Sequence, residues 1–207
     1  MESGTPMLPV DLDVTRSVRA YMAHCMSSAQ FCLDHVHQGL REAAWYSPKD
    51  RRVLRTLCDE HPHDFTRWLY ERECEGRYTG LLMVWPAAYS TPIHDHAGLW
   101  GIEMVLQGAL SVDDYELLPG ERGRTQPHFS GTTVLAEGQS CAFRGTDGHA
   151  HRCTNLSAHR PAVTLHVYGG LLQTYRNFDV AIGGGFVAAP TVAKIDGQLG
   201  PARLRHA

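Results

Sequence analysis

The chain has 207 residues, with 19 Lys and Arg against 22 Asp and Glu, and a formal net charge of −3. This near balance excludes the broad basic surface that is typical of proteins that bind nucleic acid or anionic membranes. No apolar run is long enough to span a bilayer and the N-terminus resembles no secretion signal, so we expect a soluble, cytoplasmic protein that is a monomer or small homo-oligomer.

The first 61 residues carry two helical patterns. Apolar residues recur at steps of three and four over residues 13–44, which predicts one long helix, with Asp13 or Thr15 as its cap. The stretch "SPKDRRVLRTLCDEHP" predicts a second helix, because Ser47 suits an N-cap and Pro48 suits the first helical position. We therefore expect an N-terminal helical layer at about residues 13–61.

From about residue 65 to 180, short β-like runs replace the helical pattern. These runs are cut by Gly, Pro and Asp, and they read "YTGLLMVW", "GLWGIEMVLQGALSVDDYELL", "GTTVLAEGQSCAFRG", "HAHRCTN" and "AVTLHVYGG". Many short strands at this spacing predict a sandwich or a small barrel. The Gly-rich residues 183–207 either form a surface tail or add an edge strand. We expect a single domain over residues 1–207.

A His-Asp-His triplet opens one of these runs. In "TPIHDHAGLW", His94 and His96 are one residue apart, and on a strand their side chains would face the same way, about 6–7 Å apart. Two such imidazoles can meet one metal ion, while Asp95 points away. The alternative is a surface His-x-His in a loop, but 13 histidines in this chain favour a metal site.

A third histidine has a spacing of its own. In "DGHAHRCTN", the positions of Gly148, His151 and Asn155 repeat the second motif of cupin barrels. The pair His94-x-His96 begins the first cupin motif. His149 faces the same side as His151, but only His151 has the required distance to Asn155.

The carboxylate that normally completes the first cupin motif is missing. Counting back from Gly108 puts Gly101 at the position of the glutamate ligand, which leaves three neutral imidazoles. Glu103 lies two residues further along the same face. It is the alternative source of an extra metal ligand.

The run "AVTLHVYGG" has one polar and one apolar face. Thr164, His166 and Tyr168 alternate with Leu165 and Val167. A half-exposed strand is the ordinary interpretation, but solvent-facing strands usually carry Lys, Glu or Ser. Three hydrogen-bonding groups in series are instead typical of a cavity lining.

Together these motifs resemble the thiol dioxygenases, the family of cysteine dioxygenase and 3-mercaptopropionate dioxygenase, over about residues 65–180. "STPIHDH" is similar to the family's metal-binding segment, "HRCTN" to its third-ligand segment and "TLHVYGG" to its Ser-His-Tyr strand. "FTRWL" resembles the segment whose Arg, here Arg67, holds the substrate carboxylate in the cysteine enzymes. The resemblance implies an all-β cupin jelly-roll barrel with an N-terminal α-helical layer.

The sequence departs from the family pattern at two positions that bear on the substrate. Gly101 stands where animal cysteine dioxygenases have a Cys that crosslinks to the Tyr, so we expect Tyr168 to be a free phenol. Gly101 and the preceding Trp100 are similar to the bacterial mercaptopropionate branch, yet that branch has Gln where Arg67 stands. The resemblance therefore leaves the thiol open.

The implied chemistry is the addition of both atoms of O2 to the sulfur of a small thiol carboxylic acid, which gives a sulfinic acid. Fe(II) would be the cofactor, because three imidazoles on one face of the ion leave room for thiolate and O2. His94, His96 and His151 would be the metal ligands, and Arg67 would bind the substrate. Tyr168, His166 and Thr164 would be the catalytic residues, with Tyr168 donating a proton or hydrogen bond.

The sequence leaves two other functions open. One is a cupin dioxygenase or isomerase that uses Glu103 as an extra metal ligand on a non-thiol substrate. The other is a non-catalytic cupin that binds a small acid.

Overall fold

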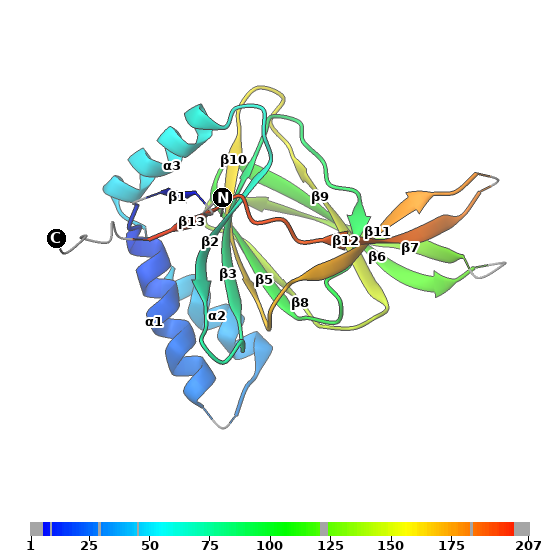
Figure 1. Cartoon of the computed structure of the whole chain (residues 1–207), viewed down its shortest axis with the longest axis horizontal. Helices are drawn as coiled ribbons and strands as arrows, with labels where there is room; N and C mark the ends of the chain where they lie inside the picture. Colours follow the sequence, from blue (N-terminus) through cyan, green and yellow to red (C-terminus); the bar gives the residue numbers. More distant parts are fainter. Residues whose placement is uncertain are drawn as a thin grey trace, which may run out of the picture.

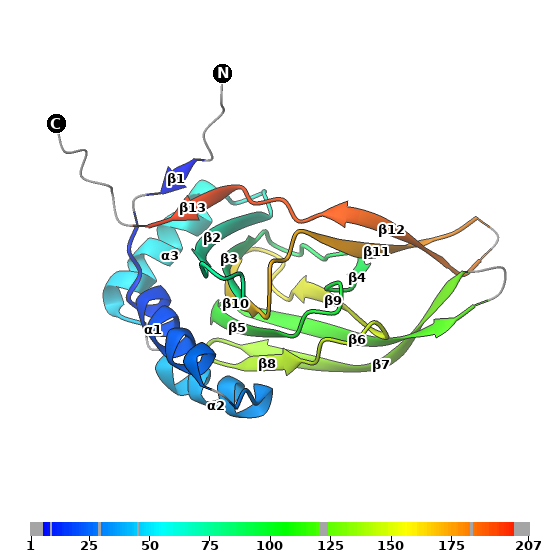
Figure 2. The same ribbon diagram turned by 60° about the horizontal axis from the view of Figure 1, so that its bottom comes forward.

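The computed structural model describes three helices and thirteen strands in residues 6–8, 10–28, 30–44, 46–120, 124–182 and 184–200. The helices pack at one end of the β-structure, and two long hairpins extend away from them (Figures 1 and 2). The predicted β-rich fold with an N-terminal helical layer is confirmed. Within these residues, no helix combines the length and apolar character that crossing a membrane requires.

The single long helix predicted for residues 13–44 is wrong. The segment forms two helices, α1 (Asp13–Ser27) and α2 (Leu33–Ala43), with extended backbone at Ser28. The Ser27 hydroxyl donates to a carbonyl oxygen of the last turn of α1 at 2.7 Å, and the Ser28 hydroxyl accepts a backbone N–H two residues later at 3.3 Å. Such local bonds compete with the helical ladder, so the two serines end α1.

Helix α3 (Pro48–Glu60) begins as predicted, and its cap serves two helices. Ser47 Oγ accepts from the Asp50 backbone N–H at 3.2 Å, and the Asp50 carboxylate accepts from the Ser47 N–H at 3.1 Å. The same carboxylate accepts the first two backbone N–H groups of α1, at 2.8 and 3.1 Å. The prediction that Asp13 or Thr15 caps α1 is therefore wrong, because Asp50 does so from α3.

One sheet has seven strands in the order β1-β13-β2-β3-β10-β5-β8. Its strands are β1 (Met7–Leu8), β2 (Thr66–Arg72), β3 (Thr79–Trp85), β5 (Gly101–Gln107), β8 (Ser140–Phe143), β10 (Ala162–Tyr168) and β13 (Gly197–Leu199). The three helices share an apolar core with the outer face of this sheet. That core explains why the central strands β3 and β10 are buried along their whole length.

The other strands close into a ring in the order β11-β12-β7-β6-β9-β4. They are β4 (Ile93–His94), β6 (Ala109–Pro119), β7 (Thr125–Ala136), β9 (His149–Asn155), β11 (Thr174–Val180) and β12 (Phe186–Val192). The hairpins β6–β7 and β11–β12 form the long projection seen in Figure 2. The C-terminal stretch, for which the sequence left two outcomes, supplies β12 and β13; residues 183 and 201–207 lie outside the described residues.

Strand β10 has different partners on its two faces. Val163, Leu165 and Val167 lie in the core shared with the helices. On the other face, Tyr168 belongs to a second core, to which both sheets contribute. Thr164 and His166 alternate with the helix-facing residues and are 2% exposed. The polar row of β10 therefore faces the interior between the sheets and not solvent.

Candidate metal centre

Two strands of the closed ring bring three histidines together. His94 of β4 pairs directly with His151 of β9, and His96 follows His94 after one residue. The three side chains each offer a ring nitrogen, and these nitrogens all lie within 4.8 Å of one another. The ring centroids are 4.6–5.1 Å apart. Three imidazoles at this separation can bind one transition-metal ion.

The protonation of the three histidines suits metal binding. Burial lowers the pKa of His94 to about 4 and the pKa values of His96 and His151 well below their usual range, so the rings are neutral. His94 Nδ1–H donates to the Pro92 carbonyl oxygen at 3.0 Å, which leaves Nε2 free to bind a metal. His151 Nδ1 is buried and has no hydrogen-bond partner among the described residues. This donor set fits Fe(II).

Asp95, between the two histidines, fixes the loop that carries His96. Strand β4 ends at His94, so the predicted strand geometry does not continue to His96. The buried Asp95 carboxylate accepts from the Arg176 backbone N–H at 2.7 Å and from Arg176 Nε at 2.5 Å. Ala97 follows with a φ of 52°, in the left-handed region, and the chain turns there. The acid thus fastens the turn after His94 to β11.

We expect Asp95→Ala to lower the free energy of unfolding by about 1–3 kcal/mol, because a partly buried N–H and a guanidinium lose their acceptor. Chemical denaturation of the metal-free protein measures this change. Asp179→Ala, at an exposed position of β11, is the matched control and should have little effect. Equal stability of the two variants would contradict the role assigned to Asp95.

A chain of hydrogen bonds runs along the inner face of β10. Tyr168 Oη lies 3.1 Å from His166 Nδ1, and His166 Nε2 lies 2.7 Å from Thr164 Oγ1. The chain extends one member further than the sequence predicts, because Trp85 Nε1–H of β3 donates to Thr164 Oγ1 at 2.7 Å. Burial lowers the pKa of His166 to about 3 and raises the pKa of Tyr168 well above its usual value. The imidazole is therefore neutral and the phenol keeps its proton.

Arg67 of β2 points into the same space, held by aromatic rings. Its guanidinium carbon lies 4.6 Å from the ring centroid of Phe65, and Nη2 donates to Tyr175 Oη at 3.3 Å. No carboxylate of the described residues pairs with this guanidinium, so its charge is available to a bound anion. No sequence pattern placed Tyr175 of β11 at the site; its ring also lies 5.6 Å from that of His94.

These groups line one cavity of about 30 Å3, which favours a small ligand. Its wall consists of aromatic, apolar and polar side chains: Phe65, Arg67, Met83, Trp85, Thr91, His94, His96, Glu103, His151, Cys153, His166, Tyr168, Leu172 and Tyr175. The cavity therefore unites the predicted site residues, except Thr164, which reaches it through His166. Cys153 of β9 is also a wall residue.

Phe143 of β8 fills the space beside Gly101. The register places Gly101 between Tyr168 of β10 and Phe143 of β8. A Cβ at Gly101 would lie 2.2 Å from the Phe143 ring, so any larger residue would have to displace that ring. The ring stacks on His96 with centroids 4.3 Å apart. No crosslink to Tyr168 can form from position 101, and an aromatic ring packs against a metal-binding histidine there.

Glu103, the alternative metal ligand, is buried in the cavity wall. Its carboxyl oxygens lie 3.9 Å from His151 Nδ1 and 3.7 Å from His166 Nδ1. The thiol of Cys141 donates to it at 3.2 Å. Burial raises the pKa of Glu103 to about 7. Glu103, His151 and Cys153 also place ligand atoms within 4.8 Å of one another, so the carboxyl group lies beside the three-histidine set.

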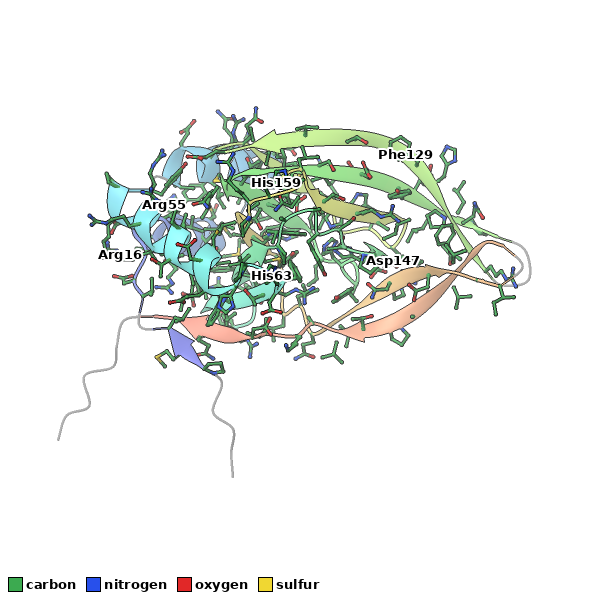
Figure 3. All side chains as sticks on the ribbon, turned by 90° about the horizontal axis from the view of Figure 1, so that it is seen from above. Arg16, Arg55, His63, Phe129, Asp147 and His159 are labelled. Carbon is green, nitrogen blue, oxygen red and sulfur yellow. The ribbon has the colours of Figure 1, made fainter. Side chains whose placement is uncertain are left out.

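The remaining histidines of the described residues, apart from His166, lie outside the site. His149 Nε2 lies 3.0 Å from Asp114 Oδ1, at the edge of the site. His63 and His159 are exposed and can be followed in Figure 3. Asn155, whose spacing singled out His151, is not a site residue; its side chain donates to the carbonyl oxygens of Trp85, Pro86 and Arg160 and holds the turn that leads to β10.

Comparisons with known proteins identify the family of this chain. Residues 38–181 match the family described as "Cysteine dioxygenase type I". The chain is 31% identical over 146 residues to "Cysteine dioxygenase type 1" of Danio rerio, covering 70% of each chain, and 29% identical over 119 residues to that of Homo sapiens, covering 58% of each. Among solved structures, TT1209 from Thermus thermophilus matches with a TM-score of 0.41 and 21% identity, over 56% of this chain and 93% of that one. The chain belongs to the cysteine dioxygenase type I family.

Proposed function

We propose that this enzyme is an Fe(II)-dependent dioxygenase that converts a small thiol carboxylic acid and O2 into the sulfinic acid. The reaction balances without a further reductant, because the thiol and both oxygen atoms all appear in the product. The observation that carries the proposal is the set of three neutral imidazoles in one cavity, beside a guanidinium that has no ion pair within the described residues. We expect the enzyme to act in the cytoplasm as a monomer or small homo-oligomer.

Family membership decides between the functions that the sequence left open. A non-catalytic cupin and a cupin acting on a non-thiol substrate are both wrong, since the chain is a cysteine dioxygenase-like thiol dioxygenase. Which thiol it uses is not fixed at 31% identity.

The residues of the cavity have separate tasks in this proposal. His94, His96 and His151 hold Fe(II), which supplies the redox chemistry when it is bound. Arg67 binds the substrate carboxylate through its planar fork of donors. Phe65 and Tyr175 keep the guanidinium in place through the contacts described above. This arrangement orients the sulfur toward the three histidines.

Tyr168 is the proton donor in this proposal. Trp85 determines in which direction the hydrogen bonds of the chain that ends at Tyr168 are donated. An indole N–H can only donate, so Trp85 occupies one lone pair of Thr164 Oγ1. The Thr164 hydroxyl hydrogen is then directed at His166 Nε2, and His166 Nδ1–H donates to the oxygen of Tyr168. The phenolic hydrogen is left free to point into the cavity.

Anaerobic reconstitution with Fe(II), followed by exposure to isotopically labelled O2, tests the function. Mass analysis with cysteine, 3-mercaptopropionate and mercaptosuccinate should give a sulfinate that carries two labelled oxygen atoms from at least one thiol. A product with one labelled oxygen, or O2 uptake that does not depend on any thiol, would contradict the proposal.

Arg67→Ala should weaken the apparent affinity for the carboxylated thiol roughly ten- to a hundredfold while iron stays bound, because a hydrogen bond to a charged group contributes about 1.5–3 kcal/mol. Tyr175→Phe removes one hydrogen bond to the guanidinium and should weaken affinity less, by about 0.5–1.5 kcal/mol. Steady-state kinetics and iron quantification check both changes. Unchanged affinity of Arg67→Ala for every carboxylated thiol would remove Arg67 from the substrate site.

A further inference from the structure

Glu103 is a buried carboxyl group to which the proposed reaction gives no task. It lies on β5, and the register places it opposite His166 of β10 and Cys141 of β8. Its exposed fraction is 3%, and among the described residues no Lys or Arg pairs with it. A carboxyl group buried in this way needs hydrogen-bond donors.

The donors around Glu103 differ in strength and in availability. The thiols of Cys141 and Cys153 lie 3.2 and 3.9 Å from its oxygens, and thiols are weak donors. His166 Nδ1 already has Tyr168 as a partner at 3.1 Å. His151 Nδ1, 3.9 Å from Glu103 Oε1, is buried without a partner in the described residues. A carboxyl group that lacks a strong donor and a ring nitrogen that lacks a partner therefore face each other.

We infer that Glu103 is a positioning residue for His151: its carboxylate accepts the His151 Nδ1–H, so that the opposite nitrogen, Nε2, binds the metal. The inference rests on the proposed metal site. A metal-bound histidine commonly donates its second ring N–H to a carboxylate, which fixes the tautomer and the ring orientation. A relative movement of about 1 Å brings the two atoms to hydrogen-bond distance.

This assignment differs from the one that the sequence left open. As an extra ligand, Glu103 would contribute an oxygen to the metal itself. As a positioning residue, it acts through His151 and leaves the ligand set with three imidazoles. The Cys141 thiol donates to the carboxyl group from one neighbouring strand, and His166 flanks the group from the other, so the carboxyl group lies beside the His151 ring, which suits this second role.

Co(II) binding to metal-free protein, followed by visible absorption, is the test. Glu103→Leu removes the carboxyl group and should weaken Co(II) binding about ten- to a hundredfold. Glu103→Gln keeps an oxygen that accepts the Nδ1–H, so it should restore part of the affinity. Both variants should keep the wild-type shape of the absorption spectrum, because the ligands are unchanged.

Asp114→Asn is the matched control. Asp114 Oδ1 lies 3.0 Å from His149 Nε2, so this is also a carboxylate–histidine pair, but one outside the three-histidine set. The Co(II) affinity of the Asp114→Asn variant should equal that of the wild type. If Glu103→Leu does not fold, Glu103→Gln carries the test, with several-fold weaker binding and unchanged unfolding of the metal-free protein as the expected result.

Wild-type Co(II) affinity in Glu103→Leu, or in Glu103→Gln where that variant carries the test, would overturn the inference. A changed spectral shape in Glu103→Gln would also overturn it and would make Glu103 a direct ligand. If the wild-type protein itself binds no Co(II), the proposed metal site fails first. That outcome is distinct from failure of the Glu103 assignment alone.

Discussion

His151→Ala should empty the metal site and abolish oxygenation. The ring supplies one of three nitrogens that lie within 4.8 Å of one another, and two remaining imidazoles bind a divalent ion far more weakly. His94→Ala and His96→Ala should have the same effect. Iron quantification after reconstitution measures this loss. We expect iron occupancy of roughly a tenth or less of the wild-type value, because losing a ligand should weaken binding at least as much as losing a group that is hydrogen-bonded to a ligand.

His149→Ala is the control for this prediction. His149 and His151 lie on one face of β9 with ring centroids 6.0 Å apart, but His149 pairs with Asp114. Iron content should therefore stay near the wild-type value. An empty site in His149→Ala together with a filled site in His151→Ala would move the third ligand to the other histidine.

Tyr168→Phe should lower turnover roughly a hundred- to a thousandfold, while iron content and fold persist, because one positioned proton donor is removed. The phenol bonds to His166 and lines the cavity, whereas its ring packs in the interior core. Phenylalanine keeps that packing. The measurements are the rate of sulfinate formation and the ratio of O2 consumed to sulfinate formed. Purified wild-type protein should also run as a single uncrosslinked band, because Gly101 provides no sulfur.

Two variants make the Tyr168 experiment specific. Tyr115→Phe changes a tyrosine of β6 that packs against Phe129 outside the cavity, and it should have little effect. Thr164→Ser keeps the oxygen that bonds His166 and Trp85, so activity should be nearly unchanged. Full and well-coupled activity in Tyr168→Phe would remove the hydrogen-bonded chain from the mechanism.

Patterns among residues that are close together in the sequence predict much of the fold and of the site. The capping box of Ser47 and Asp50 lies within a single helical turn, so the start of α3 could be predicted correctly from the local sequence. The polar row on β10 needed only the alternation of a strand. The three-histidine set was predicted from two local spacings, that of His94 and His96 and that of His151 and Asn155. The pairing of His94 with His151 then brings the two segments together. Arg67 was expected only from the family resemblance, since a single Arg on a strand has no distinctive spacing.

What the sequence missed depends on pairing between distant segments. Tyr175 reaches the cavity because β11 pairs with β4, and no pattern within its own strand indicates this position. Phe143 meets His96 because β8 pairs with β5, which lies far from it along the chain. Asp50 caps α1 from another helix. No local pattern encodes such contacts, because each is fixed by the packing of the whole domain.

The fit between Gly101 and Phe143 couples the two positions, so that a substitution at one changes the effect of a substitution at the other. Gly101→Cys alone would force a Cβ against the Phe143 ring, which stacks on His96. Phe143→Ala alone would leave a cavity at a cost of about 3–5 kcal/mol. Each single substitution should destabilise the protein, and the second should offset part of the effect of the first, because a smaller side chain at position 143 makes room for the added sulfur. The two positions are therefore epistatic, and the stability cost of the double substitution Gly101→Cys with Phe143→Ala should be smaller than the sum of the two single costs.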